Sequence, residues 1–158
     1  MGAHMDLYKS FCKGRDGIQS FFRYVLISMT IGVVSYLPVI SRGLTNSHDG
    51  LWKSSYHQAG NLELSAGRWA WLFLDKIRGG YAAEPFNSLL TLLLLVIGIY
   101  IVFYTFGFEK HHIAYSLLII ISPTVCCYLS YRFMSPTFGM SFLLVLVAGW
   151  LSTKSLNK

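Results

Sequence analysis

The amino-acid sequence predicts an all-α, polytopic membrane protein with about four transmembrane helices. Of its 158 residues, 54% are hydrophobic and only 13% are charged, whereas a soluble domain carries about 25% charged residues. The mean hydropathy is +0.50. Four apolar stretches approach or reach the length of about 20 residues that a helix needs to cross a bilayer. The aromatic share of 16% excludes a disordered chain, because disordered chains are rich in charge and poor in aromatic residues.

The four transmembrane spans are expected at about 21–40, 89–108, 113–131 and 138–151. The second span contains no charged residue. The third contains Pro123, at which we expect a kink that the neighbouring helices accommodate. The fourth is short unless residues 133–137 extend it. Together these spans define a membrane domain over residues 21–151.

The charges outside the spans indicate an orientation. Residues 1–4 read as an expression-vector scar, residues 5–20 as a cytoplasmic N-terminal tail and residues 152–158 as a cytoplasmic C-terminal tail. With the N-terminus inside, seven of the 13 Lys and Arg residues lie inside and six outside. The basic cluster before the first span carries the most weight. We therefore expect both termini in the cytoplasm and the long loop, residues 41–86, on the periplasmic side.

The long loop is expected to carry an amphipathic helix over Ser65–Arg78. One face of this helix would be apolar and consist of Trp69, Leu72, Phe73 and Ile77. Gly79 and Gly80 would end it. Because it has two Trp residues and basic flanks, the helix should lie in the membrane interface. Glu84 and Pro85 then precede the second span, where proline suits the first helical turn.

Two residues early in the loop are candidates for acid–base chemistry. Asp49 follows the first span closely, so it should lie at the outer membrane surface within reach of a lipid-linked group. A carboxylate there can be catalytic, or it can form an Asx turn before Gly50. His48 is the alternative base, since its unperturbed pKa of about 6.5 suits proton transfer at neutral pH.

Arginine and lysine residues of the loop are candidates for binding a donor phosphate. Arg68, at the start of the interfacial helix, can hold a phosphate with two parallel hydrogen bonds, or it can extend toward lipid headgroups. Lys53 and Arg78 are the competing phosphate contacts.

No cofactor is expected from the sequence, and a divalent metal stays open. His111 and His112 are adjacent rather than four residues apart, so they lack the spacing of a helical metal pair. Cys126 and Cys127 have no CxxC partner. The basic residues are scattered rather than clustered, which argues against nucleic-acid binding.

Two segments resemble a known family. The stretch SYLPVISRGLTNSHDGLWKSS … AGRWAW, from Ser35, and the stretch LSYRFMSPTFGMSFLLVLVAGWL, from Leu129, resemble the bacterial O-antigen glucosyltransferases of Gtr type II, which are GT-C-like membrane glycosyltransferases. The chain is similar to the N-terminal portion of such an enzyme. The resemblance implies a multi-pass protein of the bacterial inner membrane. It would transfer a sugar, glucose in this family, from a polyprenyl-phosphate donor to the O-antigen of lipopolysaccharide on the periplasmic side.

The resemblance also implies partners and roles. The expected partners are the polyprenyl-phosphate-linked sugar, the O-antigen acceptor, membrane lipid, a small flippase and a polyprenyl-phosphate sugar synthase. The early-loop acid, Asp49, would be the general base. A phosphate leaving group has a second pKa of about 6 and needs little protonation, so one base and nearby cations suffice for an inverting transfer. The alternative is a non-catalytic four-span protein, such as a lipid-linked-sugar flippase or an assembly partner.

Overall fold

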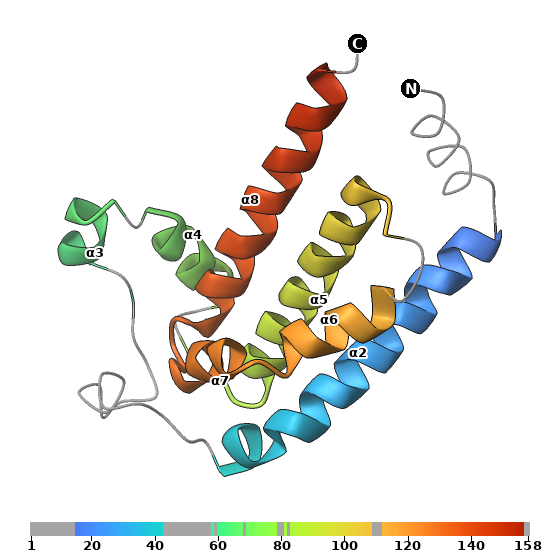
Figure 1. Ribbon diagram of the computed structural model, residues 1–158. Helices are drawn as coiled ribbons and strands as arrows, with labels where there is room; N and C mark the ends of the chain where they lie inside the picture. The colour runs from blue at the N-terminus through green and yellow to red at the C-terminus, as the bar shows by residue number, and fades with distance from the viewer. Residues whose placement is uncertain are drawn as a thin grey trace.

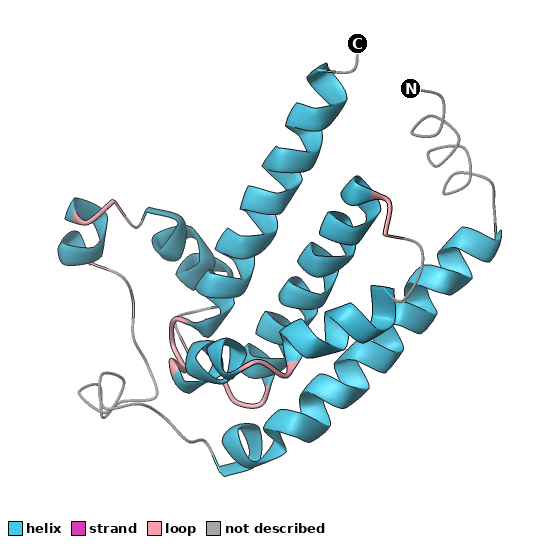
Figure 2. Ribbon diagram, in the orientation of Figure 1, coloured by secondary structure: helices cyan, strands magenta, loops and turns pink. Residues whose placement is uncertain are grey.

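The structure is a computed structural model that describes residues 15–42, 58, 60–67, 69–78, 81, 83–108 and 112–156 (Figure 1). These residues form seven helices and no β-strand (Figure 2). Among them, three helices are long and apolar enough to cross a membrane, and a bent pair of shorter helices makes a fourth crossing if it is counted as one span. The predicted all-α, polytopic membrane fold is therefore confirmed.

Helix α2 spans Arg15–Arg42, so it extends beyond both ends of the predicted first span. Its inward face carries two tyrosines, Tyr24 and Tyr36, that are 0% and 6% exposed. Both hydroxyl groups find partners on other helices. The Tyr24 hydroxyl lies 2.6 Å from Ser116 Oγ and 3.3 Å from the carbonyl oxygen of Val96. In an apolar surrounding such bonds matter, because a buried hydroxyl without a partner is costly.

Helix α5 spans Phe86–Phe106 and forms the centre of the bundle. It begins directly after Pro85 and ends at Gly107, whose φ of 69° is the left-handed conformation that glycine adopts without strain. Two core clusters join α5 to α2, and each also includes residues of α2. Helix α5 contributes Leu92, Leu95, Val96, Ile99 and Phe103 to them. The most apolar stretch of the sequence is thus the best-buried helix.

The predicted third span is broken into α6 (His112–Ile120) and α7 (Pro123–Ser130), which meet at an angle of 49°. Pro123 starts α7, as expected for a residue that lacks a backbone N–H. The Tyr36 hydroxyl lies 2.8 Å from the carbonyl oxygens of both Ile120 and Ser122. It therefore supplies a donor where the helical hydrogen bonds are interrupted, which is how membrane proteins tolerate such breaks.

Helix α8 spans Ser135–Leu156 and packs parallel to α5. A Cβ on Gly139 would lie 3.2 Å from Leu94 Cβ and from the carbonyl oxygen of Thr91, and a Cβ on Gly98 would lie 2.9 Å from the Phe142 ring. The residue numbers of the two helices rise together along this contact, so both run in the same direction. The chain between them must return to the opposite end of the bundle, and α6 with α7 makes that return. The bent pair is therefore a broken crossing rather than a re-entrant loop.

Two short helices, α3 (Asn61–Ser65) and α4 (Trp69–Arg78), lie beside the bundle (Figure 1). The predicted helix over Ser65–Arg78 thus begins later than expected, after Gly67 at a φ of 76°. The apolar face of α4 is largely uncovered: Trp69, Phe73 and Ile77 are 70%, 62% and 69% exposed.

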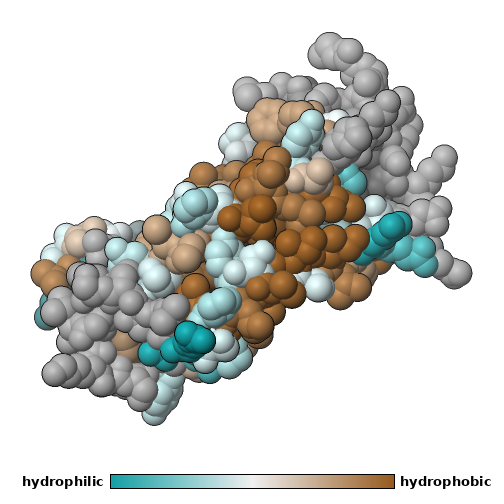
Figure 3. Space-filling view, turned by 60° about the horizontal axis from the view of Figure 1, so that its bottom comes forward, coloured by the Kyte–Doolittle hydropathy of each residue, from teal (hydrophilic) through white to brown (hydrophobic). Residues whose placement is uncertain are grey.

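The two ends of the bundle differ. One end contains the C-terminus of α2, the start of α5 and the connection from α7 to α8, and we call it the loop end (Figure 1). The start of α2 and the end of α8 lie at the opposite end. Between the ends, a broad apolar surface covers much of the face in Figure 3. This pattern suits a bundle whose middle contacts lipid.

Candidate functional site

An open groove of about 630 Å³ lies at the loop end, and we call it the loop-end groove. Its lining comes from α2, from the start of α5 and from the connection between α7 and α8: Val33, Leu37, Ile40, Ser41, Arg42, Glu84, Pro85, Leu89 and Arg132. The apolar residues come from the membrane-spanning parts of α2 and α5. Arg42 ends α2, Glu84 lies just before α5, and Arg132 lies in the connection between α7 and α8. The groove therefore has an apolar wall and a charged head.

The charged head combines two cations with one carboxylate. Arg42 is the last residue of α2 and is exposed. Both carboxylate oxygens of Glu84 are buried, and among the described residues they have no hydrogen-bond partner. A buried carboxylate oxygen without a hydrogen bond is costly. Arg42 and Arg132 line the same groove as this carboxylate.

The backbone of Arg132 is held in place by hydrogen bonds from two neighbours. Asn87, fully buried in the first turn of α5, donates from Nδ2 to the carbonyl oxygen of Arg132 at 3.0 Å and to that of Tyr81 at 3.3 Å. Ser135 Oγ donates to the same Arg132 carbonyl at 3.4 Å. These bonds tie the segment before α5 to the connection before α8, so they fix two sides of the groove relative to each other.

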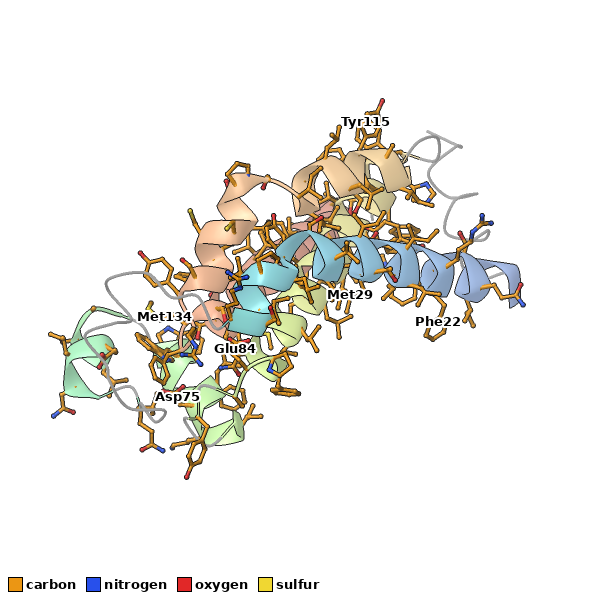
Figure 4. The ribbon with its side chains drawn as sticks, turned by 90° about the horizontal axis from the view of Figure 1, so that it is seen from below. Phe22, Met29, Asp75, Glu84, Tyr115 and Met134 are labelled. Atoms are coloured by element: carbon orange, nitrogen blue, oxygen red, sulfur yellow. The ribbon has the colours of Figure 1, made fainter. Side chains whose placement is uncertain are left out.

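Helix α4 carries a further carboxylate, which is buried on the side of this helix that packs inward, and α4 contacts α8. Asp75 is only 2% exposed, and its neighbours Trp71 and Leu74 are 5% and 8% exposed. Figure 4 shows Glu84 near the last turn of α2, with Phe22 toward the opposite end of that helix. The side of α4 that carries Asp75 is thus packed inward, while the predicted apolar face is largely uncovered.

The arrangement suits an anionic lipid. A guanidinium group binds a phosphate through two parallel N–H···O bonds. A carboxylate with unused acceptor capacity binds hydroxyl groups. The apolar wall provides a surface for an alkyl chain at about 25 cal/mol per Å² of area removed from water. The loop-end groove offers all three kinds of surface side by side.

The residues predicted from the sequence lie mostly outside the described part of the chain. His48, Asp49, Lys53 and Arg68 are not among the described residues. Arg78 is the last residue of α4, but its side chain is also outside that part. The roles expected for these residues, acid–base chemistry and phosphate binding, therefore stay predictions. No group of three or more His, Cys, Asp or Glu side chains that could hold a metal occurs among the described residues.

The sequence reasoning missed the groove residues as a cluster. Glu84 was expected directly before the second span, and Arg42 and Arg132 belong to the six basic residues expected on the outer side. The available signal was their shared position: each is an ionisable residue directly next to an apolar stretch, and the expected topology places all three at the same membrane surface. A single charge at the end of a span is ordinary, because its side chain can reach the membrane surface, so the signal lies in the three positions together.

Comparison with known proteins adds the family. The family described as "Glucosyl transferase GtrII" matches residues 54–157. Glu84 and Arg132 of the groove lie inside this range, as do Arg68 and Arg78, whereas Asp49 lies before it. A search of curated proteins and a search of solved structures found no match. The match covers well over half of the chain and includes α3 to α8, and this chain therefore belongs to the GtrII glucosyl transferase family.

Proposed function

We propose that the protein takes part in the transfer of glucose from a polyprenyl-phosphate donor to the O-antigen of lipopolysaccharide, at the periplasmic face of the bacterial inner membrane. The observation that carries this proposal is a charged groove with an apolar wall, at the loop end of a membrane bundle whose family is a glucosyl transferase family. A lipid-linked sugar has an apolar chain in the membrane and a phosphate at its surface. The groove has an apolar wall that could contact the chain and charged residues at its head that could contact the phosphate.

The proposed reaction is an inverting displacement at the anomeric carbon of the donor sugar. Asp49, or His48 in its place, removes the proton from an acceptor hydroxyl, and the oxygen attacks the anomeric carbon. The bond from that carbon to the phosphate oxygen breaks, and polyprenyl phosphate leaves. Cations of the long loop, Arg68 with Lys53 and Arg78 as alternatives, stabilise the charge that develops on the phosphate. This route needs neither a cofactor nor protonation of the leaving group.

Helix α4 supports the proposal by its two-sided packing. Its inner side is buried, with α8 as a packing partner, and its outer side presents Trp69, Phe73 and Ile77. A helix with such an apolar face and basic neighbours is suited to lie in the membrane interface. It would hold the preceding loop, and with it Asp49, at the depth of the donor phosphate. A small flippase that delivers the donor and a synthase that makes it are the proposed partners.

The test is reconstitution of the chain in liposomes that contain the donor with radiolabelled glucose. Soluble O-antigen polysaccharide is the acceptor, and glucose bound to the polysaccharide is measured. We expect transfer from polyprenyl-phosphate glucose and none from a nucleotide-linked glucose. If the chain moved the donor between leaflets but transferred no glucose, the non-catalytic flippase reading would replace this one.

A further inference from the structure

The head of the loop-end groove is built from three charges that no part of the family comparison assigns. Arg42, Glu84 and Arg132 come from three separate segments, and all line the same groove. Two cations against one carboxylate favour an anionic ligand. Because Glu84 keeps both oxygens without a hydrogen-bond partner among the described residues, the ligand should also bring donors of its own.

The apolar wall sets a second requirement. Leu37 is 53% exposed, although it faces the groove from the membrane-spanning part of α2. Val33 and Leu89 continue the wall in the direction of the bilayer centre, away from the charges. A ligand that fits both parts therefore has an anionic, hydroxyl-bearing head and an alkyl chain that runs from the membrane surface inward.

We infer that the loop-end groove binds the lipid-linked donor directly. Arg42 and Arg132 contact its phosphate, Glu84 accepts hydrogen bonds from its sugar hydroxyls, and Leu37 and Leu89 contact the first part of its polyprenyl chain. This inference rests on the proposed function, and it gives phosphate binding to residues outside the loop helix. Arg68, Lys53 and Arg78 are then additional cations rather than the main phosphate site.

The hydrogen bonds around Asn87 join the backbone segments that carry Glu84 and Arg132. The carbonyl oxygen of Arg132 accepts from Asn87 Nδ2 at 3.0 Å, and Thr91 Oγ1 donates to the Asn87 carbonyl at 2.7 Å. Because Asn87 follows Glu84 by three residues, the carboxylate and the guanidinium are attached to one hydrogen-bonded unit. Charges that are already in position bind an ion without a free-energy cost for rearrangement.

The test measures binding of two lipids to the full chain in phosphatidylcholine nanodiscs. One lipid is polyprenyl-phosphate glucose, and the other is polyprenyl phosphate without the sugar. Arg42→Ala should weaken the binding of both lipids by about tenfold or more, the usual effect of losing a charged hydrogen bond. Arg23→Ala is the matched control, because Arg23 is an exposed arginine of α2 near the opposite end; it should leave both affinities unchanged.

Glu84→Ala separates the sugar from the phosphate. It should weaken the binding of polyprenyl-phosphate glucose severalfold, and it should leave the binding of polyprenyl phosphate unchanged or tighter, because a negative charge near the phosphate is removed. If Glu84 had only a structural role, Glu84→Ala would weaken the binding of both lipids equally. That result would overturn the assignment of Glu84 to the sugar. Arg132→Lys keeps the positive charge but loses the paired N–H donors of the guanidinium group. It should therefore weaken the binding of both lipids.

Leu37→Trp tests the apolar wall. The larger side chain should occupy the groove and weaken the binding of both lipids, whereas Leu26→Trp should not, since Leu26 is an exposed residue of α2 that does not line the groove. Wild-type affinity in both Arg42→Ala and Leu37→Trp would overturn the inference. So would equally strong competition by phosphatidylglycerol, because that result would make the groove a general phospholipid site.

The inference and the proposed function fail in different ways. If wild-type chain transfers glucose while the groove variants bind the donor normally, the groove assignment is wrong and the proposed function stands. Suppose instead that the groove variants weaken the binding of the donor but the wild-type chain transfers no glucose. The proposed function is then wrong, and the groove assignment stands.

Discussion

At the residue scale, the chemistry of this chain depends on a few charges at one membrane surface. The charged share of the sequence is only 13%, and three of these residues line one groove. Their positions could be predicted individually, because each borders an apolar stretch. Their convergence could not, because it depends on which helices pack together and in which direction. Pattern in a single sequence does not contain that information.

The general base is the first residue-scale prediction. Asp49→Asn should keep membrane insertion and donor binding but lower glucose transfer by about 10² to 10⁴, the usual range for a lost general base. His48→Ala is the companion variant, measured at matched expression by glucosylated O-antigen. Near-normal product from Asp49→Asn together with an inactive His48→Ala would move the base to His48. Near-normal product from both would remove this pair from the mechanism.

At the element scale, the spans could be predicted from hydropathy and the break in the third span from Pro123. These features are local, since each depends on composition within about one helix length. The burial of Asp75 could not be predicted. The periodicity of α4 shows that the helix has an apolar and a polar face, but it does not show which face packs against the bundle. Nor could the parallel packing of α5 and α8, which depends on Gly98 and Gly139 meeting side chains of the other helix.

Packing between α5 and α8 gives an element-scale prediction. Gly98→Val should destabilise the protein by about 1–3 kcal/mol, the usual cost of overpacking, because a Cβ there would lie 2.9 Å from the Phe142 ring and 3.1 Å from Leu146 Cδ1. Gly149→Val is the control, since a Cβ on Gly149 meets nothing within 4 Å. Unfolding in mixed detergent micelles measures the difference. Equal stability of the two variants would contradict the packing described here.

The orientation of α4 gives a second element-scale prediction. We expect its uncovered face, with Trp69 70% and Phe73 62% exposed, to lie in the lipid headgroup region. Single-Trp proteins that keep only Trp69 or only Trp71 would be compared with brominated lipids of known depth. Trp69 should be quenched by bromine near the headgroups. If Trp69 were instead quenched by aqueous iodide as strongly as a free loop tryptophan, α4 would not be an interfacial helix.

At the scale of the whole molecule, four crossings place the start of α2 and the end of α8 at the same end of the bundle (Figure 1). Lys154 lies over the Trp150 ring at 3.9 Å near the end of α8, a pairing suited to a membrane–water interface. The sequence predicted the same number of crossings. The basic residues divide seven against six between the two sides, so the expected orientation depends on the cluster before the first span.

Topology is therefore tested by labelling. Single cysteines would replace Ser47 and Ser155 in a chain from which Cys12, Cys126 and Cys127 have been removed. A membrane-impermeant thiol reagent applied to intact spheroplasts should label position 47 and not position 155, because we expect the loop in the periplasm and the end of α8 in the cytoplasm. Labelling of position 155 alone would invert the orientation and move the proposed reaction to the cytoplasmic face.

The most direct measurement is photocrosslinking with polyprenyl-phosphate glucose that carries a photoreactive group on the first isoprene unit. The central claim is that the donor binds at the loop end of the bundle. After irradiation of the reconstituted chain, mass spectrometry of its peptides should find the crosslinks within Val33–Arg42 of α2 and Glu84–Leu89 at the start of α5, and excess unlabelled donor should abolish them. Crosslinks confined to the opposite end, on Phe103–Phe108 or α6, would contradict the account.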